Sequence, residues 1–528
     1  MHATLRHIEA LGRAHLAPTQ ERWHPLEARQ TILELMEETA LAQVLSFAAR
    51  RRCLAVHAVS PAARVYSELT QPFEKRALYE MCLGDRLAHA VWNAPVGDPA
   101  RERLSCSVWW LEKCGLPLHL SDTVVLDFLR STAPALLPRV CGLTVGTMWG
   151  HFERGAADVP QLEELRVWSG GAFSFCGTEP SQMTRLRRLE VDGCTAEVST
   201  FVRRLPALKE LSISRGDGLL VHLEEPLCAD RLVRLSITAA ATRTVSWMRR
   251  CVSLTHLSLL RCATDMNIAP LSELPCLESL DVSESGVRHL VGLHNCPSLR
   301  SVCVSRCPLL LSLEGLVDAP ALQTIQAAGS SVQSIGQLHK CPRLTSVCFS
   351  RCGSLGSLHG LAGALQLRSI DASGSGLRAI GELRRCSRLT SVVFDHCRQL
   401  ESLEGLAGAP QLQSIDASGS GVQAIGELRR CPSLATVRLN NCRWLSSLEG
   451  LAGAPQLLFI GASFTAVRAL GELRRCPRLV SVAFAGCDEL ESLEGLYGAP
   501  ELQKVEASAS LVEAWRTDLV AKRGGHSM

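Results

Sequence analysis

The chain has 528 residues, of which 46% are hydrophobic, and its formal net charge is +3. This length exceeds what one ordinary globular core fills, so the sequence predicts several domains or a repeat array. The small net charge does not by itself indicate a polyanionic partner. The N-terminus carries charges throughout, unlike a secretory signal peptide, and no apolar stretch approaches the roughly 18 residues of a membrane span. We therefore expect a soluble cytoplasmic protein without membrane contact, a nuclear location also staying open.

Residues 1–135 lack the repeat that fills the rest of the chain. Apolar residues recur there at helical spacing in four segments, 27–57, 71–92, 101–114 and 121–131. We expect a small helical domain that caps the N-terminal end of the repeat array.

Within this region, residues 41–69 resemble an F-box, although the usual leading Leu-Pro and the Trp after the Val-Ser pair are missing. The residues that match the F-box core are Val44, Leu45, Ser46, Phe47, Val59 and Ser60. The resemblance implies that Leu41, Val44, Leu45 and Phe47 dock a Skp1-like adaptor. The chain would then be the substrate receptor of an SCF-like ubiquitin ligase. An ordinary pair of capping helices is the alternative.

Residues 136–510 are built from repeats of a 45-residue unit. Each unit splits into halves of 23 and 22 residues. In the first half, Leu299, Val302 and Val304 precede Cys307, and apolar residues then recur at every third position. The alternating apolar residues predict a short strand with its aliphatic side chains inward. The period of three predicts a 3₁₀ or irregular return to the next strand. About 17 repeats start at Val140, Leu162, Leu186, Leu208, Leu232, Leu254, Leu277, Leu299, Leu322, Leu344, Leu367, Leu389, Leu412, Leu434, Leu457, Leu479 and Leu502.

This LxxLxLxx(N/C) pattern is the signature of leucine-rich repeats. The 22-residue half resembles the short repeats of bacterial internalins, and the cysteine-bearing half resembles the repeats of F-box-linked receptors. The mixture is similar to leucine-rich-repeat proteins of trypanosomatid parasites. The resemblance implies an α/β solenoid with a curved parallel sheet and 3₁₀ or irregular convex returns. Residues 511–528 lose the pattern, and we expect a short helix there as the C-terminal cap.

The 23 cysteines suggest disulfides or a metal site, but their spacing favours another role. Equivalent positions two coils apart lie roughly 10 Å from each other, whereas a disulfide needs Cα atoms within about 7 Å. We therefore predict small buried hydrophobes in a reducing compartment. The two registers are Cys251, Cys296, Cys341, Cys386, Cys431 and Cys476, and Cys262, Cys307, Cys352, Cys397, Cys442 and Cys487.

The outward side chains of the strands are the expected binding surface, because solenoids of this kind bind proteins on their concave face. This face is mostly small and polar, with few large anchors, although Phe459 and Phe464 stand out. The candidate protein-binding residues are Arg166, Trp168, His256, Asp281, Arg306, Arg351, Asp371, His396, Asp416, Arg438 and Phe464.

A second candidate surface is basic. Arginine pairs occupy one register before the turn and predict a stripe on the solenoid edge, which would suit RNA or an acidic protein. Glu382, Glu427 and Glu472 lie two residues before them, so a solvated edge is the alternative. The pairs are Arg384 and Arg385, Arg429 and Arg430, and Arg474 and Arg475.

Motifs for catalysis, cofactors or metals are missing from the sequence. The segments 374–376 and 419–421 read Gly-Ser-Gly but lack the Lys-Ser/Thr of a P-loop, so we interpret them as turns. The leading hypothesis is a non-enzymatic scaffold that binds a protein partner on the concave face. The F-box-type substrate receptor comes second, and an RNA-associated adaptor comes third.

Overall fold

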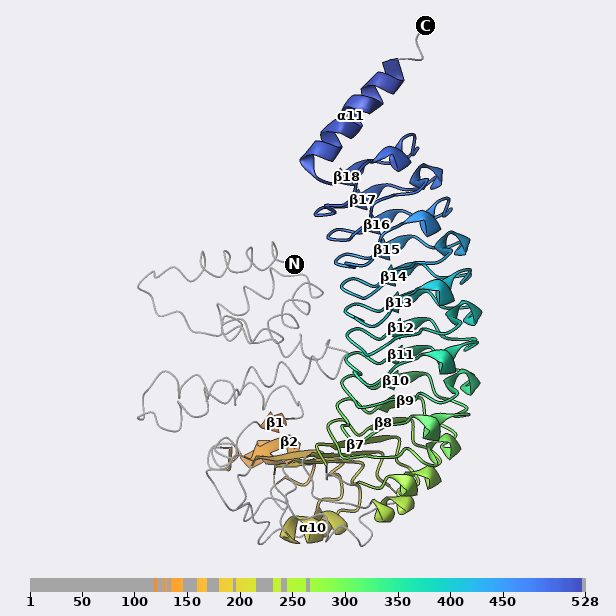
Figure 1. Ribbon diagram of the computed structural model, residues 1–528. Helices are drawn as coiled ribbons and strands as arrows, with labels where there is room; N and C mark the ends of the chain where they lie inside the picture. The colour runs from red at the N-terminus through yellow and green to blue at the C-terminus, as the bar shows by residue number, and fades with distance from the viewer. Residues whose placement is uncertain are drawn as a thin grey trace, which may run out of the picture. The chain divides into compact units, whose positions relative to one another are not determined.

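The computed structural model describes residues 118–120, 126, 129–130, 134–145, 159–168, 180–192, 196–214, 231–238, 245–262 and 266–524. The chain (Figure 1) divides into two compact units, residues 1–213 and residues 214–528. The F-box-like segment and the predicted helices of residues 27–114 lie outside the described residues, so they stay predictions.

The first unit contains short parallel strands. Strand β1 pairs with β2, β2 with β3, and β3 with β4. The peptide nitrogens of Lys209 and Glu210 donate to the carbonyl of Arg187, which ties the fifth strand to the coil of β4. Three short helices accompany the strands: η2 (Pro134–Arg139), η3 (Pro180–Gln182) and α10 (Ala196–Arg203). The strands are β1 (Leu118–Leu120), β2 (Val140–Val145), β3 (Glu164–Trp168), β4 (Arg188–Asp192) and β5 (Glu210–Ser214).

The second unit is a leucine-rich-repeat solenoid. From β6 to β18 each strand pairs in parallel with the next, and the buried middle residues stand in register, as Ile415 does with Val437. One strand per repeat and a parallel sheet are therefore confirmed. The strands are β6 (Arg234–Thr238), β7 (His256–Leu260), β8 (Ser279–Asp281), β9 (Ser301–Cys303), β10 (Thr324–Gln326), β11 (Ser346–Cys348), β12 (Ser369–Asp371), β13 (Ser391–Val393), β14 (Ser414–Asp416), β15 (Thr436–Arg438), β16 (Phe459–Gly461), β17 (Ser481–Ala483) and β18 (Lys504–Glu506).

The returns between these strands contain 3₁₀ helices, as the period of three predicts. They line the side of the unit opposite the strands (Figure 1). A final helix, α11 (Ala509–Gly524), follows the last strand. The 3₁₀ helices are η5 (Ser246–Arg250), η6 (Ala269–Glu273), η7 (Leu293–Asn295), η8 (Glu314–Leu316), η9 (Leu338–Lys340), η10 (His359–Leu361), η11 (Leu383–Arg385), η12 (Glu404–Leu406), η13 (Leu428–Arg430), η14 (Glu449–Leu451), η15 (Leu473–Arg475) and η16 (Glu494–Leu496).

The core explains why the repeat unit is two coils long. From β9 to β17, the inward side chain two residues after the buried middle of each strand alternates between large and small. Phe349 and Phe394 are fully buried in coils that alternate with those of Ala372 and Ala417, which are also fully buried. A large side chain therefore faces a small one in the next coil, and the volumes fill the interior at native density.

The cysteines of both registers are buried, as predicted. Their thiols also donate hydrogen bonds to backbone carbonyls one coil back. The Cys431 Sγ lies 3.2 Å from the Leu406 oxygen, and the Cys442 Sγ lies 3.1 Å from the Ala417 oxygen. Burial raises the pKa of Cys251 to about 12 and that of Cys296 to about 11. These thiols therefore stay protonated and serve as packing groups that join adjacent coils.

Candidate protein-binding surface

We define the strand face as the side chains that point away from the core along the second unit's strands. In β14 the middle residue, Ile415, is fully buried, whereas Ser414 and Asp416 on either side are partly exposed. Side chains alternate in this way because successive residues of a strand point to opposite faces of the sheet. The strand face is therefore an ordered array with one row for each strand position.

The first row consists mainly of Ser and Thr, which stand side by side in register. Neighbouring hydroxyls bond to one another: Thr324 Oγ1 lies 2.9 Å from Ser301 Oγ, and Ser369 Oγ lies 2.8 Å from Ser346 Oγ. These short side chains make the surface flat and polar. Larger neighbouring side chains therefore protrude from it.

Three predicted aspartates, Asp281, Asp371 and Asp416, lie on the strand face, but hydrogen bonds within the turns occupy their carboxylates. Asp371 accepts hydrogen bonds from the Ser373 backbone nitrogen at 3.0 Å and the Ser373 hydroxyl at 2.6 Å, and Ser350 Oγ lies 2.9 Å away. Burial acts to raise the pKa of Asp371, but these hydrogen bonds outweigh it and hold the pKa below its ordinary value. Asp281 and Asp416 make the same bonds to the serines two residues on. The carboxylates thus organise the turn after each strand.

A second row runs along the turn that follows the strands, and we call it the αL row because its residues have left-handed backbone. Its peptide nitrogens extend the ladder by one bond, as His396 N does to the Ser418 oxygen at 2.7 Å. Glycine meets this geometry without strain at Gly374 and Gly419, with φ of +64° and +66°, which confirms that the Gly-Ser-Gly segments are turns. The members with side chains are Arg261, Glu284, Arg306, Arg351, His396, Asn441 and Phe464, with φ between +53° and +61°.

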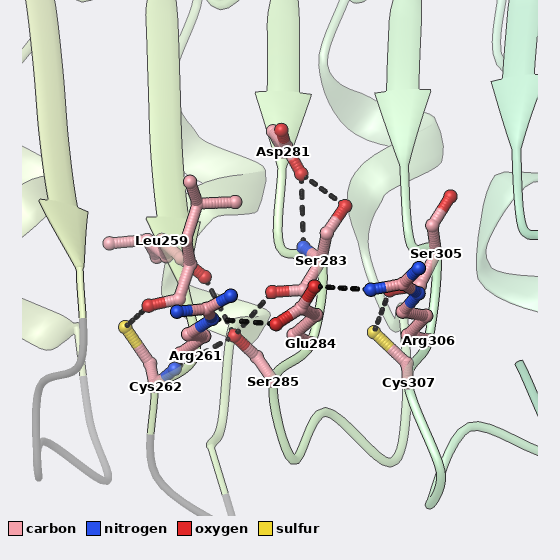
Figure 2. A network of polar contacts seen from close by, with 11 residues as sticks. Leu259, Arg261, Cys262, Asp281, Ser283, Glu284, Ser285, Ser305, Arg306 and Cys307 are labelled. Carbon is pink, nitrogen blue, oxygen red and sulfur yellow. Dashed lines mark hydrogen bonds and ion pairs between the residues drawn. The ribbon is translucent and has the colours of Figure 1, made fainter.

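Three members of the αL row form an ion-paired cluster (Figure 2). Arg261 Nε lies 2.6 Å from one carboxylate oxygen of Glu284, and Arg306 Nη1 lies 3.0 Å from the other. The hydrogen bond from Arg261, and then the charges and bond of Arg306, lower the pKa of Glu284 below its ordinary value. Arg261 and Arg306 remain largely exposed, with 66% and 72% of their side chains accessible, so the cluster presents two guanidinium groups to solvent.

The glycines of the αL row also make room for the large side chain of the preceding coil. A Cβ on Gly419 would lie 2.4 Å from the His396 Nδ1, and a Cβ on Gly486 would lie 2.4 Å from the Phe464 ring. The imidazole and the phenyl ring therefore lie across a neighbouring glycine. Between Arg306 and Asn441 the αL row thus alternates large side chains with glycines at a spacing of two coils.

The other predicted strand-face residues are placed as follows. Arg166 in β3 pairs with Glu190 in β4 at 3.5 Å, and Trp168 is the last residue of β3. His256 begins β7, is exposed and lies 2.8 Å from the Thr255 hydroxyl. Arg438 ends β15 and is exposed. The candidates therefore divide between the strands and the αL row rather than forming one row.

The arginine pairs lie in η11, η13 and η15, within the returns. In each case one glutamate bridges both arginines. Glu382 contacts Arg384 at 3.2 Å and Arg385 at 2.6 Å, and Glu427 and Glu472 repeat the arrangement. Each pair therefore carries a net charge of about one, which weakens the stripe as a site for a polyanion.

The residues that could dock a Skp1-like adaptor, Leu41, Val44, Leu45 and Phe47, lie outside the described part of the chain. Within the described part, no group of three or more His, Cys, Asp or Glu side chains could hold a metal ion. No helix among these residues is long and apolar enough to cross a membrane.

Comparisons of this chain with known proteins show a similarity of fold alone. The sequence matches no model of a known family and no curated protein. The structure is similar to the leucine-rich-repeat protein LIC12759 of Leptospira interrogans, at 11% identity over 73% of this chain and 96% of that one, with a TM-score of 0.46. It is also similar to the functional domain of InlJ from Listeria monocytogenes, which includes a cysteine ladder, at 14% identity over 62% and 69%, with a TM-score of 0.37. A third likeness is to TLR13 in its complex with ssRNA13, at 14% identity over 70% and 68%, with a TM-score of 0.37. The leucine-rich-repeat fold itself follows from the strands, spacing and buried ladder described above.

Proposed function

We propose that this chain is a non-enzymatic scaffold that binds a protein partner along the strand face of its solenoid. The observation that carries the proposal is the αL row. A residue with a Cβ costs roughly 1–2 kcal/mol in left-handed backbone, whereas glycine costs nothing comparable. The chain uses glycine at this position in alternate coils, as at Gly374, yet keeps Arg351 and His396 in the coils on either side.

Folding gives no reason for these large residues. The side chain of His396 is 68% exposed, and Arg351 is exposed as well, so neither contributes much buried area. Strained backbone that carries exposed polar or aromatic groups is typical of sites that contact another molecule. A protein partner suits the surface, because its cations, hydroxyls and aromatic rings are spread over many coils.

The test compares partners of the full-length chain with those of two variants. Partners are identified by proximity labelling in cells and confirmed by pull-down with the purified protein. The variant with Arg351→Gly and His396→Gly removes side chains and backbone strain together, so it keeps the fold, and we expect it to lose the partner. The matched control, with Arg384→Ser and Arg385→Ser, alters the returns and should keep the partner.

The opposite pattern would refute the proposal. If the control loses the partner and the αL-row variant retains it, binding lies on the arginine edge. Binding that is then lost on treatment with RNase, or that falls steeply with salt, would identify the edge as an RNA-associated surface.

A further inference from the structure

The related 45-residue repeat units provide an internal comparison for β15 and β16. Phe459 stands in register two coils from Ser414, which begins β14. Gly461 stands in the same relation to Asp416. The two segments share the buried Leu, Ile and Ala of the core, which are residues 412, 415 and 417 in one and 457, 460 and 462 in the other. At the strand positions of Phe459 and Gly461, the differences remove a carboxylate and add an aromatic ring.

The changes fit one another sterically. A Cβ at Gly461 would lie 3.1 Å from Phe459 Cε1 and 3.2 Å from the side-chain amide of Asn440, so an aspartate there would crowd the ring. The guanidinium carbon of Arg438 lies 5.8 Å from the centroid of the Phe459 ring, within the range of a cation–π contact. Glycine at 461 thus clears the space in which the ring and the guanidinium stack.

Phe464 adds a second aromatic ring to the same coil. It occupies the αL row with φ of +58°, where the two preceding units have Gly374 and Gly419. A bulky residue with positive φ is a rare and strained choice. The side chain of Phe464 is nevertheless 59% exposed, so only part of its ring surface is buried to offset the strain. A binding contact accounts for an exposed, strained phenylalanine, whereas packing does not.

Arg438 brings a positive charge to the Phe459 ring. Arg438 is exposed, and no carboxylate of the described residues forms an ion pair with it. Its register neighbour Asp416 is bonded instead to Ser418, at 3.1 Å from the backbone nitrogen and 2.8 Å from the hydroxyl. The outward residues beside the rings include Leu458, at 36% exposure, and Val480. The surface therefore combines apolar side chains with one stacked guanidinium whose donors suit a carboxylate.

From this geometry we propose that Arg438, Leu458, Phe459, Phe464 and Val480 form an aromatic–arginine patch that binds a protein segment presenting a carboxylate beside an apolar side chain. The carboxylate accepts hydrogen bonds from the guanidinium of Arg438, the adjacent apolar side chain packs on the ring of Phe459, and a residue further along the segment contacts Phe464. Aromatic and arginine residues of this kind dominate the free energy of protein interfaces. The proposal rests on the proposed scaffold function and specifies where and with what chemistry the partner is held.

The experiment selects ligands from a phage library of random dodecapeptides on the purified full-length chain. The selected peptides are synthesised with a fluorophore, and their affinity is measured by fluorescence anisotropy for the native chain and for Arg438→Val, Phe459→Ser and Phe464→Gly. Each substitution introduces the residue that the chain itself has at the equivalent position of an earlier unit, so the variants keep the fold. The matched control, Arg384→Ser, alters an exposed arginine of the returns, and His396→Gly reports on the αL row outside the patch.

We expect enriched peptides with Asp or Glu next to an aromatic or aliphatic residue. Each patch variant should bind them at least 10-fold more weakly, while Arg384→Ser binds them as the native chain does. If His396→Gly weakens binding and the patch variants do not, the patch proposal is wrong and the strand-face scaffold stands. If no strand-face variant changes binding, or no peptide is selected, both fail. Binding of a single-stranded RNA dodecamer that depends on Arg438 while peptide binding does not would overturn the patch in favour of a nucleic-acid site.

Discussion

Neighbouring coils stack so closely at some glycines that a side chain would not fit. Substitution of Gly405 is the sharpest test of this close contact. Gly405 lies in η12 and faces the carbonyl oxygen of Gly381 one coil back. A Cβ on Gly405 would lie 1.8 Å from that oxygen, whereas real Cβ atoms stay beyond 3.0 Å, so the two backbones would have to separate by at least 1.2 Å. Neither group is a flexible side chain. We expect Gly405→Ala to lower the free energy of unfolding by about 3 kcal/mol or more, at the upper end of overpacking costs.

Gly408 provides the matched control three residues later. It has φ of +91°, and a Cβ there would meet nothing within 4 Å. Gly408→Ala should therefore cost only the left-handed strain, roughly 1 kcal/mol. Urea unfolding followed by far-ultraviolet circular dichroism measures both variants, and hydrogen exchange at the Leu406 amide reports the local effect. Equal destabilisation by the two substitutions would refute the close contact between coils.

Three further predictions concern the buried thiols and the N-terminal region. The raised pKa values of Cys251 and Cys296, about 12 and 11 against an ordinary 9.0, mean that the unfolded chain releases protons above pH 9 while the folded chain keeps them. Stability should then fall by about 1.4 kcal/mol per thiol for each pH unit between 9 and 11, and a flat profile of unfolding free energy across that window would contradict the burial. Iodoacetamide should modify the exposed Cys276 quickly and Cys296 only after unfolding, as peptide mass spectrometry can show; equal rates would be inconsistent with the packed ladder. If residues 41–69 act as an F-box, a Skp1-like protein should co-purify with the chain and be lost on Leu45→Asp or Phe47→Asp, and its absence from the native chain's complexes would end that hypothesis.

The strands and returns could be predicted from sequence because each depends on a local period. Leu322, Ile325 and Ala327 alternate as a strand requires, and the spacing of the following apolar residues matches a 3₁₀ return. The reason for the double-length unit was harder to see. It requires knowing that Phe394 and Ala417 occupy the same layer in adjacent coils, which is a property of packing between repeats.

The binding surface was predicted less completely. Strand register identified Asp416 as outward-facing, but the hydrogen bonds that use its carboxylate locally depend on the three-dimensional turn. The residue type of Arg351 does not reveal its left-handed backbone. The sequence signal for that conformation is Gly374, which occupies the same register in the next coil. Strand register also placed Gly461 on the outward face, but its role beside Phe459 was not predicted. Comparing Gly461 with Asp416 in the preceding unit would have indicated that role.

The central claim is that a partner is bound on the strand face rather than on the returns. Photo-crosslinking from two positions of the same coil tests it most directly. The photoreactive residue p-benzoylphenylalanine is placed either at Asn441, in the αL row, or at Glu449, in η14; both residues are exposed. If the partner lies on the strand face, we expect a specific protein to crosslink from Asn441 and not from Glu449. Crosslinking of that protein from Glu449 alone, or equally from both positions, would contradict it.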